Sequence, residues 1–179
     1  MESTFLHPER IVARFDLKPG EKAADFGAGG GFFTIPMARC VGPEGGVYAI
    51  DIQKHNLDVI KAKARLEHLL NIEYVWGNLE ILGGSKIKNE SVDFVIISNI
   101  LFQAEKRQEV LREALRVLKK GGRCALLEWD ESKFSFGPPM ESRVPKRTAQ
   151  GSAQSVGFEL EKEFEAGSHH YGLMLRKPA

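Results

Sequence analysis

The stretch Asp25-Phe26-Gly27-Ala28-Gly29-Gly30-Gly31 decides the fold. It overlaps the end of the apolar run Lys22–Phe26, which predicts a strand, and it precedes Phe32–Val41, which predicts a helix closed by Gly42. Glycines at such a strand-to-helix turn let a ligand approach the backbone, and the start of the helix offers free N–H groups. The turn therefore favours a nucleotide-like ligand, although glycines alone can also serve only to make a tight turn.

Strands and helices continue to alternate on the carboxyl side of this turn. Apolar stripes predict one helix that ends at Asn71 and another that is closed by Gly121-Gly122. Ser91–Ser98 is an almost unbroken apolar run, which is typical of a parallel strand covered on both faces, so we expect it in the middle of a sheet. The pattern is that of five β-α units, with further strands at Gly46–Ile52, Ile72–Trp76, Ser91–Ser98 and Arg123–Trp129.

The last third of the chain changes character. Met140–Val156 predicts a helix, and Phe158–Phe164 and Tyr171–Arg176 predict two strands joined by a short Ala166-Gly167-Ser168 link. A link of that length favours an antiparallel pair. We therefore expect an α/β fold, a doubly wound, mostly parallel seven-stranded sheet with an antiparallel C-terminal strand, and a single domain over residues 1–179.

Composition excludes several classes of protein. The chain has 179 residues, 42% of them hydrophobic, and a formal net charge of +1, so binding to nucleic acid is not expected. The N-terminus has an early acid and no apolar core, unlike a secretory signal, and we find no apolar stretch long enough for a membrane span. Cys40 and Cys124 are expected to be buried and reduced in the cytoplasm.

The spacing of the glycines distinguishes between nucleotide cofactors. A dinucleotide fingerprint would need a third glycine where Phe32 or Thr34 stands, which disfavours NAD. The spacing D-x-G-x-G-x-G instead closely resembles the first motif of Rossmann-like, class I S-adenosylmethionine-dependent methyltransferases, and the likeness covers nearly all of residues 5–177, including the helix and turn of Glu113–Gly122.

The resemblance extends broadly to quinone-type C-methyltransferases. It implies transfer of a methyl group from S-adenosylmethionine to a small-molecule or lipid-like acceptor that it does not identify. Two alternatives remain open: a non-catalytic module that binds S-adenosylmethionine and regulates a partner, and an RNA methyltransferase, since one fold serves several functions. The oligomeric state is left open.

The resemblance also implies a set of cofactor-binding residues. Asp51 would bind the ribose hydroxyls, with Ile52 against the adenine, although a solvated strand-end aspartate is the alternative. Asn78 would contact the adenine amino group, or it could simply form a turn. The complete set is Asp25, Gly27, Ala28, Gly29 and Gly31 at the methionine end, Asp51, Ile52, Asn78 and Leu79 at the nucleoside end, and Asn99 through its backbone.

Candidate catalytic residues follow from where the strands end. In an open α/β sheet the ligand lies beyond the carboxyl ends of the strands, so acceptor contacts are expected from Asn99–Gln103, Trp129–Ser132 and Ala166–His170. If a general base exists, we expect it to be His169 or His170, whose side chains should point to opposite faces of a strand and therefore form no zinc site. No metal site is expected, and both histidines could equally be ordinary surface or core residues.

The size of the chain leaves little room for acceptor recognition. Small relatives often carry a histidine after the fourth strand, where this chain has Phe102-Gln103. Phe5-Leu6-His7 could cover the cofactor or merely pack on the first helix. An apolar acceptor is suggested by Phe102, Trp129, Phe134 and Phe136, and an anionic one by Arg143, Lys146 and Arg147.

Overall fold

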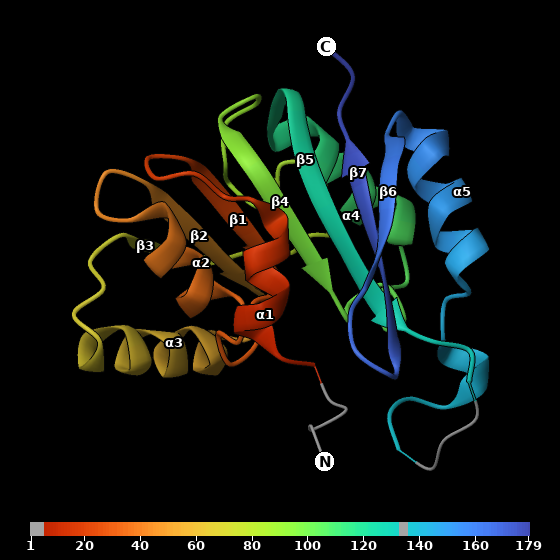
Figure 1. Ribbon diagram of the computed structural model, residues 1–179, viewed down its shortest axis with the longest axis horizontal. Coiled ribbons are helices and arrows are strands. Elements are labelled where there is room, and N and C mark those ends of the chain that lie inside the picture. Colours follow the sequence, from red (N-terminus) through yellow and green to blue (C-terminus); the bar gives the residue numbers. More distant parts are fainter. Residues whose placement is uncertain (1–5, 133–135) are drawn as a thin grey trace.

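The protein is described by a computed structural model that covers residues 6–132 and 136–179. Its described residues form a seven-stranded sheet in the order β3-β2-β1-β4-β5-β7-β6 (Figure 1). β4 is the middle strand, as its apolar run predicts, and β7 runs antiparallel to both β5 and β6. The strands are β1 Lys22–Phe26, β2 Gly46–Asp51, β3 Ile72–Trp76, β4 Val92–Ser98, β5 Leu118–Trp129, β6 Glu159–Glu165 and β7 His170–Arg176.

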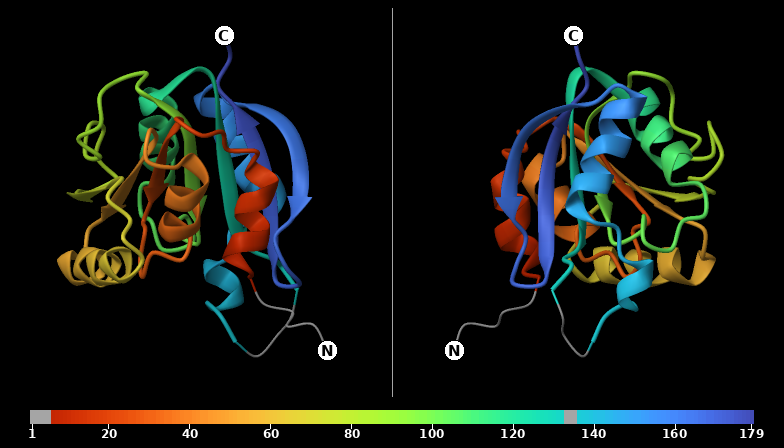
Figure 2. Two further views of the ribbon diagram at one scale, coloured as in Figure 1. Left: turned by 60° about the vertical axis from the view of Figure 1, so that its left-hand side comes forward. Right: turned by 90° about the vertical axis from the view of Figure 1, so that its right-hand side faces the viewer.

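Helices cover both faces of this sheet, which confirms the doubly wound prediction (Figure 2). On one face lie α1 Pro8–Val12, α2 Thr34–Val41 and α3 Lys54–Leu66, and on the other lie α4 Arg107–Val117 and α5 Lys146–Val156. Within β4, Phe94 and Ile96 pack into the first of these two cores, and Val95 and Ile97 pack into the second. The strand is therefore apolar on both faces because each face is covered by helices.

Two connections differ from the sequence prediction. The helix predicted to reach Asn71 ends at Leu66, and the chain reverses at His68, which has a φ of 55°. Asn71 instead uses its side-chain amide to donate hydrogen bonds to the carbonyls of Ala38 and Gly42. Between β3 and β4 the chain forms turns and no helix, so the prediction of five β-α units is wrong at this point.

The helix predicted over Met140–Val156 is divided in two. A 3-10 turn at Met140–Ser142 is separated from α5 because Arg143 is extended and Pro145 restricts the residue before it. β5 also begins earlier than predicted, at Leu118, and its pairing with β4 becomes irregular around the Gly121-Gly122 turn before it resumes at Arg123.

The two cysteines differ in their surroundings. Cys124 is buried, as expected, but Cys40 is exposed on α2, so the prediction of a buried side chain is wrong there. Among the described residues, no helix has the length and apolar character that crossing a membrane requires.

Candidate functional site

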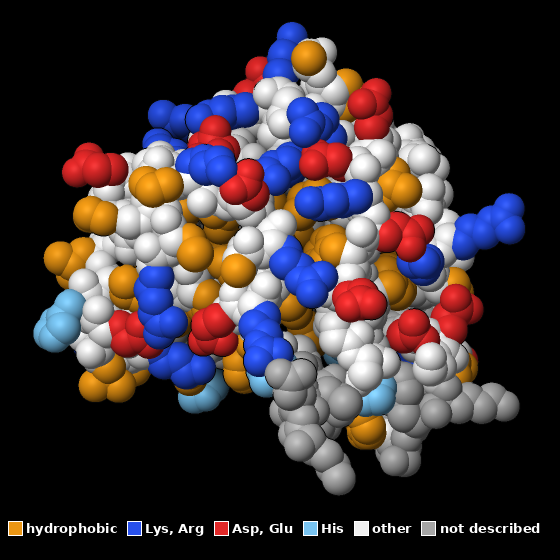
Figure 3. Space-filling view, in the orientation of Figure 1, with side chains coloured by type: hydrophobic (Ala, Val, Ile, Leu, Met, Phe, Trp, Pro, Cys, Tyr) orange, Lys and Arg blue, Asp and Glu red, His pale blue; other side chains and the backbone are white. Residues whose placement is uncertain are grey.

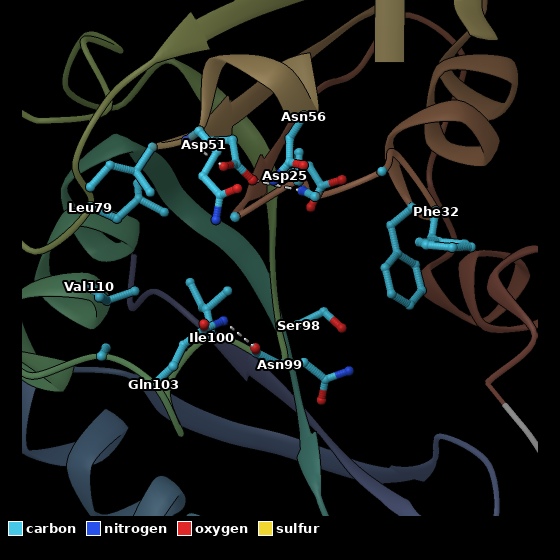
Figure 4. Close-up of a pocket in the computed structure, with 18 of the residues that line it drawn as sticks. Asp25, Phe32, Asp51, Asn56, Leu79, Ser98, Asn99, Ile100, Gln103 and Val110 are labelled. Atoms are coloured by element: carbon cyan, nitrogen blue, oxygen red, sulfur yellow. Dashed lines mark hydrogen bonds between the residues drawn. The ribbon is translucent and has the colours of Figure 1, made fainter. Parts of the chain in front are cut away.

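A cavity of about 660 Å³ opens at the carboxyl ends of β1, β2 and β4 (Figure 4). Its size falls within the range of about 300–1,000 Å³ that small-molecule sites usually have. Side chains of very different chemistry meet there: the carboxyls Asp25 and Asp51, and the apolar side chains of Ile100 and Val110. The predicted cofactor-binding residues that line it are Asp25, Gly27, Ala28, Gly29, Asp51, Ile52, Asn78, Leu79 and Asn99.

Gly31 is the member of the predicted set that does not line the cavity. Its backbone packs against α3, where an added Cβ would lie 3.0 Å from Ile60 Cγ1. Its N–H donates to the carbonyl of Ala28 and closes the turn. Gly31 therefore shapes the glycine turn from behind, while Gly30 and Phe32 face the cavity.

The Asp51 carboxylate connects two segments of the site. One oxygen, Oδ2, accepts a hydrogen bond of 2.8 Å from the Gly29 N–H, and the other, Oδ1, accepts one of 2.8 Å from the Gln53 N–H. The residue is only 7% exposed. Asp51 is thus not a freely solvated strand-end aspartate, because it holds the glycine turn and the start of α3 in place.

Asp25 is a buried carboxyl at the base of the same turn. It is 2% exposed and accepts a hydrogen bond of 2.5 Å from the Thr34 hydroxyl, which belongs to the first turn of α2. Burial raises the pKa of Asp25 to about 7, and the hydrogen bond from Thr34 opposes that rise. A cation placed beside Asp25 would therefore meet a group that can ionise near neutral pH.

The part of the cavity that follows β2 and β3 combines a polar turn with apolar side chains. Asn78 Oδ1 accepts a hydrogen bond of 2.9 Å from the Glu80 N–H, so Asn78 forms a turn as well as lining the cavity. Leu79 is buried, whereas Ile52 is 60% exposed at the rim. Asn78 therefore forms the turn that the sequence allowed, and it also faces the cavity, where the predicted contact with an adenine amino group stays a prediction.

Asn99 lies where the chain leaves β4. Its φ of 56° is unusual for a residue other than glycine. Its N–H donates to the Leu127 carbonyl at 2.9 Å, and its own carbonyl accepts from Gln103 Nε2 at 3.0 Å (Figure 4). Its side-chain Oδ1 is buried and has no hydrogen-bond partner among the described residues, so a ligand in the cavity could supply one.

Comparison with known proteins identifies the family. Residues 17–171 match the family described as methyltransferase domain. The chain belongs to this family. It is 34% identical over 127 residues to the demethylmenaquinone methyltransferase of Geobacillus stearothermophilus, covering 70% of this chain and 53% of that protein.

Other relatives agree with this assignment. The ubiquinone/menaquinone biosynthesis C-methyltransferase of Vibrio vulnificus (strain YJ016) is 34% identical over 131 residues, covering 70% of this chain and 49% of that protein. The chain thus spans about half the length of these relatives. The crystal structure of a SAM dependent methyltransferase from Aquifex aeolicus has the same fold, with a TM-score of 0.87 at 24% identity over 97% of this chain and 90% of that one.

The two candidate histidines of the methyltransferase domain, His169 and His170, have different surroundings. His170 lines the cavity, its ring lies 4.3 Å from that of Trp129, and its Nε2 is buried with no hydrogen-bond partner among the described residues. Burial lowers the pKa of His170 to about 4, so the imidazole is neutral at physiological pH. His169 is not part of the cavity lining, and its ring packs edge-on against Phe136 at 4.7 Å.

The other acceptor predictions have mixed outcomes. Trp129 and Leu6 line the cavity, whereas Phe102 and Phe136 do not, and Phe5 and Phe134 lie outside the described residues. Arg143 is 6% exposed and donates to the carbonyls of Asp130, Ser132, Phe136 and Pro138. This guanidinium connects the backbone of Asp130 and Ser132 with that of Phe136 and Pro138, and it is neither a solvated cation nor an open site for an anionic acceptor.

Several lining residues of the methyltransferase domain were not assigned to the site from sequence. Phe32 and Phe33 directly follow the glycines, and Gln53 and Asn56 follow Asp51 at the start of α3, so proximity to a predicted ligand was the available signal. Val110 belongs to the apolar stripe that predicts the helix closed by Gly121-Gly122, and that pattern carries no sign of a site. Glu128, a fully buried acid next to Trp129, was missed although a charged residue inside an apolar strand is itself a signal.

Proposed function

We propose that this methyltransferase domain binds S-adenosylmethionine and transfers its methyl group to a small-molecule acceptor. The observation that carries the proposal is the hydrogen bond between Asp51 and Gly29, which fixes a glycine turn against a strand-end acid at the mouth of the cavity. This arrangement matches the place where open α/β sheets bind nucleotide-like ligands.

The donor set fits this cofactor in chemical terms. Asp51 keeps unused lone pairs on both carboxylate oxygens, which can accept from ribose hydroxyls. Asp25 can carry the negative charge that complements an ammonium group. Ile52 and Leu79 offer apolar surface to an adenine ring, and the amide of Asn78 can exchange hydrogen bonds with its edge.

The residues of the chain supply position and exclusion of water. When bound, S-adenosylmethionine supplies a methyl group on a positively charged sulfur, which is a good leaving group. Ile100, Val110 and Trp129 form apolar parts of the cavity wall and keep water from the acceptor. The neutral His170 can hydrogen-bond to a polar group of the acceptor through Nε2 and hold it in line.

The acceptor class is inferred from the relatives and the wall of the cavity. The quinone methyltransferases that this chain resembles favour a quinone-type ring as acceptor. The rings of Trp129 and His170, whose centroids lie 4.3 Å apart at an interplanar angle of 40°, provide aromatic surface for such a ring. Arg143, whose guanidinium carbon lies 5.9 Å from the centroid of the Trp129 ring, is already engaged with backbone carbonyls, which disfavours an anionic acceptor.

The proposal includes the setting of the protein. Residues 1–179 act as one domain in the cytoplasm, where Cys40 and Cys124, both free, remain reduced. Nucleic acid is not expected as a substrate because Lys and Arg are interspersed with Asp and Glu on the face in Figure 3, without the continuous cationic stripe that phosphate binding needs.

Calorimetry and turnover test the two parts of this proposal. We expect binding of S-adenosylmethionine and S-adenosylhomocysteine with little affinity for NAD, and the reverse preference would refute the cofactor. Turnover is then measured with a panel that includes a reduced quinone-type ring and an unstructured RNA. Methylation of the ring supports the proposal, methylation of RNA alone contradicts the acceptor class, and binding without turnover on any acceptor indicates a non-catalytic module.

A further inference from the structure

Glu128 is a buried acid that the proposed function does not use. It is fully buried near the end of β5, and its Oε1 accepts a hydrogen bond of 2.6 Å from the Leu101 N–H. Its second oxygen, Oε2, has no hydrogen-bond partner among the described residues. A half-satisfied carboxyl in a protein core is expensive, because burial removes it from water without full compensation. The short hydrogen bond that Glu128 accepts from the Leu101 N–H therefore points to a role in holding the Leu101 peptide.

The register of the sheet shows what that contact replaces. The Asn99 N–H donates to the Leu127 carbonyl at 2.9 Å, as the last step of the β4–β5 ladder. In a parallel ladder such donors recur at every second residue, so Leu101 would next donate to the Trp129 carbonyl. Instead Leu101 donates to the Glu128 side chain, and the chain turns away from the sheet at that point.

A second side chain holds the other side of the same residue. Arg107 Nε, at the start of α4, donates to the Leu101 carbonyl at 2.8 Å. Leu101 is therefore held through its N–H from β5 and through its carbonyl from α4, and its side chain is buried. Both contacts are to polar groups within the fold, so the segment is fixed before any ligand arrives.

The segment held in this way forms part of the cavity wall. Residues 98–100, 103 and 104 line the cavity, on both sides of Leu101. Ile100 packs so closely on Gly27 that a Cβ added to Gly27 would collide with Ile100 Cγ2. A shift of Leu101 would therefore move Ile100 against the glycine turn and change the shape of the site.

We propose that Glu128 is a positioning residue, whose carboxyl replaces the missing ladder carbonyl for Leu101 and fixes residues 98–104 in the geometry that binds S-adenosylmethionine. The inference rests on the proposed function. It also explains why an acid, and not another apolar residue, stands in this strand. Burial raises the pKa of Glu128 to about 7, opposed by nearby N–H groups and by Arg107, and either protonation state leaves an oxygen that can accept from Leu101.

Three variants separate the hydrogen bond from simple packing. Glu128→Gln keeps an amide oxygen that can accept from Leu101, Glu128→Leu fills similar volume without an acceptor, and Leu126→Ala removes packing from the same face of β5. Hydrogen exchange of the Leu101 amide is measured by NMR in the ligand-free proteins. Binding of S-adenosylhomocysteine is measured by calorimetry.

We expect Glu128→Leu to speed Leu101 exchange and weaken binding, each by about tenfold or more, as loss of one hydrogen bond does. Glu128→Gln should stay within about threefold of the wild type in both measurements, and Leu126→Ala should leave Leu101 exchange unchanged relative to neighbouring amides of β4. If Glu128→Leu does not fold, Glu128→Asp, whose shorter side chain cannot reach Leu101, should show the same losses.

Two results would overturn the inference: wild-type exchange and affinity in Glu128→Leu or Glu128→Asp, or equal damage in Glu128→Gln and Glu128→Leu. Failure of the proposed function looks different. In that case the wild-type protein binds no S-adenosylhomocysteine, while Leu101 exchange still reports whether Glu128 holds the segment.

Discussion

Asp51 Oδ2 accepts a hydrogen bond of 2.8 Å from the Gly29 N–H, which ties the end of β2 to the glycine turn that follows β1. The two strands lie side by side in the sheet, with Asp25 paired to Ala49 and Phe26 to Ile50. Because the same carboxylate also receives the Gln53 N–H, it organises the backbone on both sides of the cavity mouth. We therefore expect Asp51 to affect a ligand in two ways, by direct contact and by holding the turn.

Replacing Asp51 separates these two effects. We expect Asp51→Ala to weaken binding of S-adenosylhomocysteine by about 1–3 kcal/mol, because ribose hydroxyls lose a charged acceptor and the Gly29 N–H is released. Asp51→Asn keeps one oxygen acceptor and should lose less. Calorimetry gives both affinities, and thermal unfolding checks that the fold is retained. Equal affinity in all three proteins would remove Asp51 from the site.

Gly29 tests the backbone of the turn itself. Its φ of 50° lies in the left-handed region, and it lines the cavity, so Gly29→Val should abolish measurable binding by straining the turn and crowding the ligand. Gly20→Val is the matched control, because Gly20 also has a positive φ but precedes β1 and does not line the cavity. Strong binding by Gly29→Val would contradict the assignment of the turn as the cofactor contact.

The raised pKa of Asp25 leads us to expect that ligand binding depends on pH. With its pKa raised to about 7, it is protonated in the ligand-free protein at pH 5, and an ammonium beside it favours the ionised form. Binding should therefore release a proton, and affinity should rise by up to about tenfold per pH unit between pH 5 and 7, then level off. Calorimetry in buffers of different ionisation enthalpy measures the released proton.

The matched variant for this prediction is Asp25→Asn. It keeps an oxygen that can accept from the Thr34 hydroxyl but cannot release a proton. We expect its affinity to be lower and nearly independent of pH over the same range. A wild-type affinity that falls as the pH rises from 5 to 7 would show that Asp25 does not pair with a cation.

Local pattern was sufficient for most of the fold. The bounds of β1 and β3 were predicted without error, because each is a short apolar run that ends in a glycine-containing turn. The middle position of β4 followed from an apolar run that must be covered on both faces. The end of α3 was predicted wrongly because Asn71 was interpreted as the residue that ends the helix. In the structure Asn71 makes a tertiary contact instead, donating hydrogen bonds to the carbonyls of Ala38 and Gly42.

The residues of the candidate site also fall into those that local pattern predicted and those that depend on tertiary contacts. Asp25 and Asp51 lie at the carboxyl ends of β1 and β2, and Gly29 is in the turn after β1, so their spacing predicted that they would meet at one edge of the sheet. Glu128 and Arg143 act on backbone groups of distant or irregular segments, Leu101 for the first and the loop after β5 for the second. No local period encodes such contacts, so only the folded chain shows them.

The two histidines provide the last prediction, which concerns the transfer step. His170 lines the cavity and has a buried Nε2 with no hydrogen-bond partner among residues 6–132 and 136–179, whereas His169 packs against Phe136 outside the lining. With a responsive acceptor, we expect His170→Ala to lower the methyl-transfer rate by about 10²-fold, the lower end of the usual range for general acid–base catalysis, because a group with a pKa of about 4 is a weak base. His169→Ala should change the rate little, and both variants should bind S-adenosylhomocysteine like the wild type, since neither histidine belongs to the glycine turn.

The part of the rate that depends on His170 should be constant above pH 5 and fall as the pH drops through 4, where the imidazole becomes charged. If His170→Ala keeps full turnover at every pH, the cavity accelerates transfer by positioning alone. If His169→Ala is slow while His170→Ala is normal, the role belongs to His169 and the assignment to His170 is wrong.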